Sequence, residues 1–180
     1  MDKLKTVIIG ATGVVGQQFV IALQNHPWFE IVHLAASERS TGKVYRDALR
    51  DERTKAFRWF CDETPGDHVL DLKVEDAGKI DVSESDIVFS AVEADVAQEL
   101  EPRFAKTTPV ISTARAFRYE EDVPILVPGV NSEQAEIINI QKRRRGWKGF
   151  ISPQPNCTTT GLAITLKPLC DSFGVESVIM

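Results

Sequence analysis

Two short stretches of this sequence combine residue types and spacings that can carry chemistry. The first, IGATGVVGQ, places Gly10, Gly13 and Gly16 directly after an apolar run and at the start of a helical pattern. The second, SPQPNCTTTG, places Cys157 where another apolar helical pattern begins. We interpret the first stretch as a phosphate-binding loop and the second as the position of a reactive thiol.

The glycine loop has a specific physical use. Glycines let the backbone turn tightly and approach a pyrophosphate, and the N–H groups at the start of the helix bind its charge. The spacing G-x-x-G-x-x-G differs from G-x-G-x-x-G, but the strand, turn and helix that should surround such a motif are all predicted here. The alternative is a glycine-rich turn that binds no ligand.

The residues after the second predicted strand distinguish the two nicotinamide cofactors. Glu38 could bind a ribose 2′-hydroxyl, as acids do in NAD sites. The neighbouring Ser37, Arg39 and Ser40 instead supply hydroxyl groups and a cation, which suit a 2′-phosphate. We therefore expect NADP as the cofactor; an ordinary solvated loop is the alternative.

Cys157 is predicted at the start of a helix, where unpaired N–H groups and the helix dipole favour a thiolate. A thiolate beside a nicotinamide cofactor predicts attack on an aldehyde or acyl group, with a thiohemiacetal and a thioester as intermediates. The N–H groups could also form an oxyanion hole. We expect Cys61 and Cys170 to be packed, unreactive residues. Three cysteines without ligand spacing predict reduced thiols and no metal site.

Apolar runs of strand length alternate with helical patterns, which predicts a Rossmann-like, doubly wound parallel sheet in an α/β protein. We expect an NADP-binding domain over residues 1–130 and the beginning of a truncated α+β catalytic and dimerisation domain over 131–180. Predicted strands cover 5–10, 30–37, 68–76, 86–92, 109–113, 148–152 and 175–180. Predicted helices cover 14–26, 94–106, 131–147 and 157–174.

The composition is that of an ordinary globular protein, with 43% hydrophobic and 26% charged residues. A net charge of -5 argues against a nucleic-acid partner, and we interpret the basic run 142–145 as a solvated helix end. No secretory signal and no apolar run of about 18 residues is apparent. We expect a cytoplasmic protein that does not bind membranes.

Several blocks, in order, resemble the N-terminal half of aspartate-semialdehyde dehydrogenase, in its archaeal and fungal branch. They are IGATGVVGQ, LAASERSTGK, DIVFSAV, FRYEEDVPILVPGVN, RRRGWKGFI and PNCTTTGLAITLKPL. The resemblance implies NADPH-dependent reduction of L-4-aspartyl phosphate to aspartate semialdehyde with release of phosphate. It implies that Cys157 forms the acyl-enzyme, Asn156 places the substrate and Arg118 binds the substrate phosphate. The implied cofactor contacts are Thr12, Gly13, Val14, Val15, Ser37, Arg39, Ser40, Ser90 and Ala91.

The sequence departs from the family pattern at Thr113, Arg115 and Gly129, which bears on the choice of substrate. The resemblance also implies that the general-base histidine and the arginine for the substrate carboxylate lie beyond residue 180. His26, His33 and His68 are poor replacements, so residues 1–180 alone should turn over poorly. The resemblance also implies that the full-length protein is a homo-oligomer.

Three alternative hypotheses about the function remain open. Two are reductases of related chemistry, acting on malonyl-coenzyme A or on N-acetyl-glutamyl phosphate. Asn156 before the cysteine favours the aspartyl substrate over malonyl-coenzyme A. The third is an NADP-binding module without turnover, in which a thiol at this place would have no use.

Overall fold

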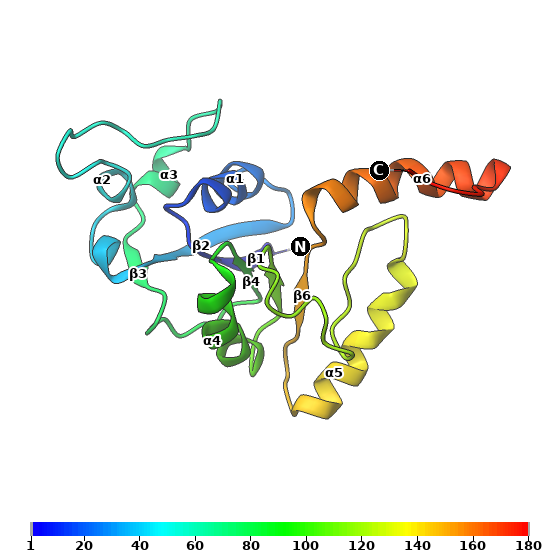
Figure 1. Cartoon of the computed structure of the whole chain (residues 1–180). Coiled ribbons are helices and arrows are strands. Elements are labelled where there is room, and N and C mark those ends of the chain that lie inside the picture. The colour runs from blue at the N-terminus through cyan, green and yellow to red at the C-terminus, as the bar shows by residue number, and fades with distance from the viewer. Residues whose placement is uncertain (1, 180) are drawn as a thin grey trace.

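The chain forms a single parallel sheet with helices on both faces, in a computed structural model that describes residues 2–179 (Figure 1). The strand order is β3-β2-β1-β4-β5-β6, and every pairing between neighbouring strands is parallel. This order confirms the predicted Rossmann-like fold. The strands are β1 (Leu4–Ile9), β2 (Phe29–Ala36), β3 (Val74–Asp76), β4 (Ile87–Ser90), β5 (Val110–Ser112) and β6 (Ile151–Pro153).

The continuous apolar run in β1 is explained by burial on both faces of the sheet. Val7 and Ile9 face a core cluster that includes Phe104, while Ile8 faces a second cluster that includes Val20. Successive side chains of a strand point to opposite faces, so a central strand covered on both sides needs apolar residues throughout. The predicted strand at residues 5–10 is therefore confirmed to within one residue.

The helices divide between the two faces of the sheet. In Figure 1, α1, α2 and α3 lie above the sheet, whereas α4 and α5 lie below it. Helix α4 continues through Pro102, and α6 extends away from the sheet with no buried residue. The helices are α1 (Val14–Leu23), α2 (Tyr45–Ala48), α3 (Asp67–Leu70), α4 (Ala94–Ala105), α5 (Ile137–Arg145) and α6 (Cys157–Phe173), with short 3₁₀ helices η1 (Glu38–Ser40) and η2 (Ser132–Glu136).

Three predicted elements differ most from the structure. The strand predicted at 68–76 is α3 followed by β3, because only Val74–Asp76 aligns with β2. The helix predicted at 131–147 begins as η2 and becomes α5, which ends at Gly146 in the left-handed conformation. The strand predicted at 175–180 is wrong over 175–179, where no described strand pairs with it; Met180 lies outside the described residues.

Residues beyond the predicted domain boundary at residue 130 contribute to the same sheet, and the boundary itself stays a prediction. Strand β6 pairs with β5, with Val110 opposite Ile151. The fully buried Gln141 of α5 binds the same strand, because its Nε2 donates to the Ile151 carbonyl and its Oε1 accepts from the Ile151 N–H, at 3.0 and 2.7 Å. Helix α5 and β6 therefore pack together at the edge of the sheet, whereas α6 extends away from it.

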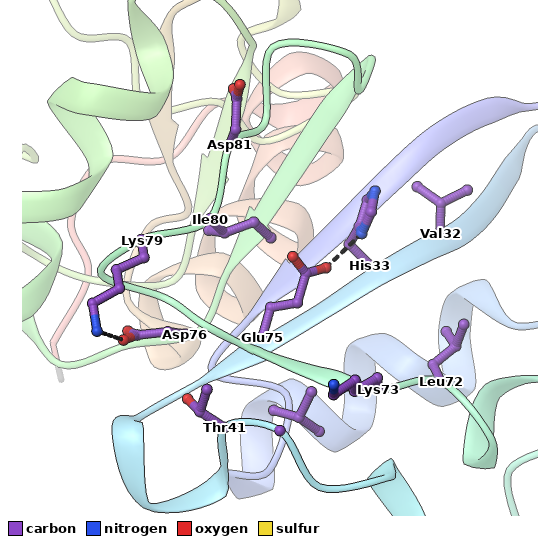
Figure 2. A pocket seen from close by; sticks show the side chains of 12 residues that line it. Val32, His33, Thr41, Leu72, Lys73, Glu75, Asp76, Lys79, Ile80 and Asp81 are labelled. Atoms are coloured by element: carbon purple, nitrogen blue, oxygen red, sulfur yellow. Dashed lines mark hydrogen bonds and ion pairs between the residues drawn. The ribbon is translucent and has the colours of Figure 1, made fainter.

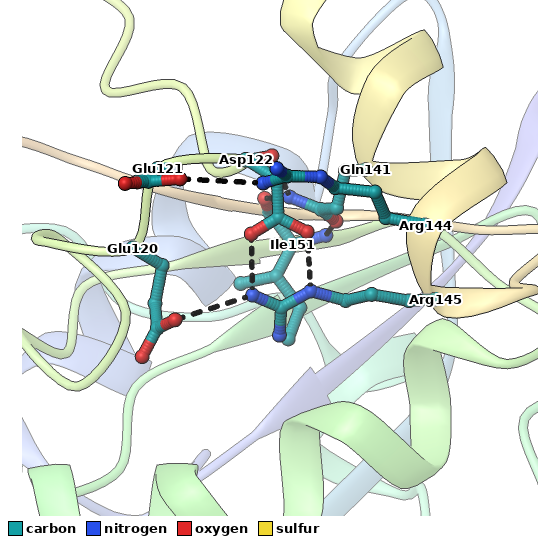
Figure 3. A network of polar contacts seen from close by, with 7 residues as sticks. All are labelled: Glu120, Glu121, Asp122, Gln141, Arg144, Arg145 and Ile151. Carbon is teal, nitrogen blue, oxygen red and sulfur yellow. Dashed lines mark hydrogen bonds and ion pairs between the residues drawn. The ribbon is translucent and has the colours of Figure 1, made fainter.

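The basic run at the end of α5 is more than a solvated surface (Figure 3). Arg145 donates from Nε and Nη2 to the two carboxylate oxygens of Asp122, at 2.7 and 2.6 Å. Arg144 pairs with Glu121 at 3.5 Å. These contacts hold α5 against the long connection between β5 and η2. The prediction of a solvated helix end is therefore wrong for Arg145.

Candidate functional site

The phosphate loop connects β1 to α1 in a space that only glycine fits at two positions. Gly10 has a φ of +80°, and a Cβ there would lie 2.5 Å from the carbonyl oxygen of Ala91. A Cβ on Gly16 would overlap the backbone carbonyl of Gly10. The loop therefore passes between α1 and the end of β4 with no room for a side chain at Gly10 or Gly16, whereas Gly13 at its outer edge is exposed.

The start of α1 is open to a ligand. Thr12 is half-buried, whereas Gly13, Val14 and Val15 are exposed, and the first turn carries no acidic side chain. A helix start of this kind presents backbone N–H groups and a positive dipole end to an anion. The structure thus places the predicted loop residues where a pyrophosphate could reach the backbone.

Two buried side chains that sequence reasoning missed hold this loop in place. Gln17, fully buried, donates from Nε2 to the carbonyl oxygens of Thr12 and Arg58, at 3.1 and 2.9 Å, and its Oε1 accepts from the N–H of Phe60 at 2.8 Å. The hydroxyl of Tyr45, on α2, donates to the Ala11 carbonyl at 2.6 Å. These bonds bring the segment 58–60 and α2 against the loop, although both are distant in the sequence.

A cavity of about 360 Å³, here called the basic cavity, lies beside the phosphate loop. Predicted residues Arg39 and Ser40 line it together with Thr12 and Gly13. Four further cations were missed, and their only sequence signal is the density of basic residues over 43–58. They are Lys43, Arg50, Arg53 and Arg58.

Two acids also line the basic cavity, and both favour the ionised form. Hydrogen bonds from Thr54 hold the pKa of Asp51 below its ordinary value, and the Lys43 ammonium, 3.0 Å away, lowers the pKa of Glu52. Five basic against two acidic side chains leave a positive balance in the cavity. Ser37 does not line it; the Ser37 carbonyl instead accepts from the N–H of Ser40. The excess of positive charge in the basic cavity suits a phosphate group.

A second cavity of about 350 Å³, here called the groove, lies where β4 and β5 end. The predicted residues Val15, Ala91 and Arg118 line it. Thr113 and Arg115, which depart from the family pattern, line it as well. The remaining lining residues are Val92, Glu93, Ala94 and Ala114. The groove therefore adjoins both the phosphate loop and the carboxyl edge of the sheet, where ligands bind in open α/β folds.

Ser90, a predicted cofactor contact, lies at the end of β4. It is fully buried, and it is not among the groove residues. Its carbonyl oxygen accepts from the N–H of Thr113 at 3.0 Å, which joins the ends of β4 and β5. The hydroxyl points inward, away from any ligand in the groove.

Cys157 is the first residue of α6, and Asn156 is the N-cap of that helix. The Asn156 Oδ1 accepts from the N–H of Thr158 at 3.0 Å, which fixes the first turn around the cysteine. Cys157 is exposed and does not line the groove. The structure connects the two through Arg118, whose Nε donates at 2.9 Å to the carbonyl of Gln154, three residues before the cysteine.

The other cysteines and the histidines stand apart from the groove. Cys61 is half-buried, which raises its pKa, but Cys170 is exposed, so the expectation of a packed residue is wrong there. His33 contacts Glu75 at 2.6 Å in a separate cavity of about 630 Å³ along β2 and β3 (Figure 2). No histidine lines the groove, and no cluster that could hold a metal ion occurs within residues 2–179. No described helix is long and apolar enough to cross a membrane.

Comparisons with known proteins agree with this geometry. The family described as "Semialdehyde dehydrogenase, NAD binding domain" matches residues 5–138. An aspartate-semialdehyde dehydrogenase of Methanothermobacter thermautotrophicus is 44% identical over 171 residues, which are 95% of this chain and 47% of that protein. A malonyl CoA reductase (NADP) of Metallosphaera sedula is 34% identical over 98% of this chain and 47% of its own length.

A solved structure extends the likeness to three dimensions. The crystal structure of aspartate semialdehyde dehydrogenase with NADP from Candida albicans superposes with a TM-score of 0.82 at 40% identity. The match covers 97% of this chain and 48% of that one. The resemblance stated from the sequence is thereby confirmed, and the chain spans about half the length of the curated relatives that it matches.

Proposed function

This chain belongs to the semialdehyde dehydrogenase family, and we propose that it forms the NADP-binding half, with the nucleophilic cysteine, of an aspartate-semialdehyde dehydrogenase. The reaction is reduction of L-4-aspartyl phosphate to L-aspartate 4-semialdehyde with release of phosphate. Such an enzyme serves the biosynthesis of lysine, methionine and threonine. The observation that carries the proposal is the phosphate loop, closed to side chains at Gly10 and Gly16, opening beside the basic cavity.

The residues present fit NADP. The loop from Gly10 to Gly16 and the start of α1 would hold the pyrophosphate, and the cations of the basic cavity, with Arg39 foremost, would hold the 2′-phosphate. The groove beside Val15 and Ala91 would receive the nicotinamide end. NADPH supplies the hydride that this reduction requires.

The acyl-transfer step depends on this chain's own residues. The Cys157 thiolate attacks the carbonyl carbon of the acyl phosphate; a sulfur–carbon bond forms, the carbon–oxygen bond to phosphorus breaks, and phosphate leaves with the electron pair. Arg118, at the edge of the groove, holds the phosphate group. Asn156 fixes the first turn of α6 and so keeps the thiol at the helix start, where N–H groups stabilise negative charge.

The remaining parts of the reaction belong to the region that the relatives have beyond this chain. We expect the general base and the arginine for the substrate carboxylate there, and the contacts between subunits of a homo-oligomer. The exposed apolar side chains Ile164, Leu169 and Phe173 of α6 are consistent with this expectation. A catalytic thiol requires reducing conditions, which favours the cytoplasm.

Reduction of malonyl-coenzyme A is the second candidate. The 34% identity to a malonyl CoA reductase supports related chemistry at the same thiol. Asn156 before the cysteine favours the aspartyl substrate. N-acetyl-glutamyl-phosphate reduction and an NADP-binding module without turnover are weaker alternatives, the latter because it would have no use for Cys157.

Two measurements test the proposal. The first is titration of the 180-residue chain with NADPH and NADH; we expect clearly tighter binding of NADPH, and equal affinities would contradict the NADP assignment. The second follows NADPH oxidation by the native protein from its source, with L-4-aspartyl phosphate and malonyl-coenzyme A offered separately. Oxidation with aspartyl phosphate supports the leading candidate, oxidation with malonyl-coenzyme A alone supports the second, and binding without turnover supports the module.

A further inference from the structure

A carboxyl group is completely buried behind the groove. Glu101 of α4 has no exposed surface, and neither do Ser90 at the end of β4 and Ser112 at the end of β5. Ala91 and Thr113, which directly follow these two strands, line the groove. Glu101 therefore lies directly behind the backbone that forms the groove wall, although it touches no ligand space itself.

One oxygen of this carboxyl group accepts a hydrogen bond. The Ser112 hydroxyl donates to Glu101 Oε1 at 2.6 Å, and the same hydroxyl oxygen accepts from the N–H of Ala114 at 3.0 Å. The chain of bonds thus runs from the carboxyl group through Ser112 to the backbone of a groove residue. It fixes the turn that follows β5.

The other oxygen has no hydrogen-bond partner, and the same is true of one neighbouring hydroxyl. Glu101 Oε2 and Ser90 Oγ are the two buried side-chain polar atoms without a partner among the described residues. An ionised carboxylate offers only acceptors, whereas a neutral carboxyl group has one O–H donor. A proton on Oε2 would give the carboxyl group a donor that the ionised form lacks, and Ser90 Oγ is a buried oxygen without a partner that could accept it.

The surroundings of Glu101 favour that proton. No ion pair within residues 2–179 includes Glu101, and an unpaired charge in such a place is strongly disfavoured. Burial raises the pKa of the carboxyl group, and the hydrogen bond from the Ser112 hydroxyl offsets part of this rise. Both observations favour the neutral form of the carboxyl group.

We propose that Glu101 is a positioning residue for the groove, which accepts a hydrogen bond from Ser112 at Oε1, donates its own proton from Oε2 to Ser90, and so ties the ends of β4 and β5 together. The functional part of this inference rests on the proposed function, in which the groove receives the nicotinamide end of NADPH. The protonation of Glu101 is independent of it.

Infrared spectroscopy tests the protonation directly. At neutral pH the 180-residue chain should show the carbonyl stretching band of a neutral carboxylic acid, and Glu101→Gln should remove it. The matched control is Glu99→Gln on the exposed side of the same helix, which should leave the band unchanged. Absence of the band in the unsubstituted chain, or its persistence in Glu101→Gln, would overturn the proposal.

NADPH binding tests the positioning role. Glutamine offers one donor and one acceptor in the same shape, so Glu101→Gln should keep the affinity within about twofold, whereas Glu101→Leu should weaken it on the order of tenfold. Leu100→Ala, a buried change on the same helix, controls for lost stability and should leave the affinity nearly unchanged. If Glu101→Leu does not fold, Ser112→Ala provides the same test from the other side of the bond.

The outcomes separate the two proposals. Equal losses in Glu101→Gln and Glu101→Leu would show that the ionised form is the native one and would overturn the inference. Unchanged affinity in both Glu101→Leu and Ser112→Ala would overturn the positioning role. If the unsubstituted chain does not bind NADPH at all, the proposed function fails, the positioning role fails with it, and the infrared band still decides the protonation of Glu101.

Discussion

Arg118 joins the groove to the cysteine segment through the backbone. Its Nε donates to the carbonyl of Gln154 at 2.9 Å, and its Nη2 donates to the carbonyl of Thr113 at 3.2 Å. Gln154 follows β6 directly, and Thr113 follows β5, so one guanidinium connects the ends of two neighbouring strands. A residue expected to bind phosphate therefore also sets the direction in which the chain leaves the sheet toward Cys157.

Replacement of Arg118 by lysine should separate charge from geometry. Lysine keeps the positive charge but lacks the planar fork that reaches both carbonyls. We expect turnover of acyl phosphate by the native protein to fall on the order of tenfold or more, with the affinity for NADPH nearly unchanged. Steady-state kinetics and NADPH titration measure the two effects, and an unaltered rate would contradict the role of the two-carbonyl contact.

Cys157→Ala should abolish acyl transfer and leave NADPH binding intact, because the thiol lies outside the groove residues. Intact-mass analysis after incubation with an acyl phosphate should detect the acyl-enzyme only where Cys157 is present. The matched control is Cys170→Ala, another exposed cysteine on the same helix, which should retain the adduct. Loss of NADPH binding in Cys157→Ala would count against this assignment.

Arg39→Ala should weaken NADPH much more than NADH, since only NADPH carries the 2′-phosphate. The loss of charge-assisted hydrogen bonds costs about 1.5–3 kcal/mol, which is roughly a 10- to 150-fold change in the dissociation constant. Arg58→Ala should act in the same direction, because Gln17 holds the backbone of Arg58 beside the loop. Arg46→Ala is the control: its guanidinium pairs with Asp71 outside the basic cavity. Equal losses for both cofactors would refute the NADP assignment.

Gly16→Ala and Gly161→Ala form a matched pair within helices. A Cβ on Gly16 would overlap the backbone of Gly10, whereas a Cβ on Gly161 would meet open space. Gly16→Ala should destabilise the fold by about 1–3 kcal/mol and impair NADPH binding. Gly161→Ala should stabilise α6 by about 0.5–1 kcal/mol. Urea unfolding measures both, and a neutral Gly16→Ala would show that the loop can widen.

The Asp122–Arg145 pair should make stability depend on pH in the acid range. The bonds from Arg145 hold the pKa of Asp122 below its ordinary value of 3.8, so the unfolded state binds the proton more readily. The stabilisation is fully present above the unfolded pKa and is lost as pH falls through the folded pKa.

Asp122→Asn measures that contribution. At neutral pH we expect a loss of about 1–3 kcal/mol in the free energy of unfolding, because the carboxylate is nearly buried and bound at both oxygens. The difference between the two proteins should shrink below a pH of about 4. Glu121→Gln, at an exposed residue of the same network, should change stability by less than about 1 kcal/mol. A difference independent of pH would exclude the ion pair as its cause.

Much of the fold and part of the site follow from local patterns. The apolar run of β1, the glycines at 10 and 16 and the helix start at Cys157 are each encoded by a short stretch of neighbouring residues. Their prediction succeeded because burial on both faces of a sheet, a tight turn and an N-cap each leave a short-range mark in the sequence. The strand predicted at 68–76 failed because apolar composition alone does not separate a short helix from a strand.

The sequence by itself therefore determined the parallel sheet, the phosphate loop and the position of the thiol. The tertiary structure alone placed Arg58 against the loop through Gln17, 41 residues away, and added β6 to the sheet through Gln141. It also buried Glu101 behind the groove between Ser90 and Ser112. These relationships are contacts between segments that meet only when the chain is packed, and the identity of a charged residue does not reveal whether it faces water or the core.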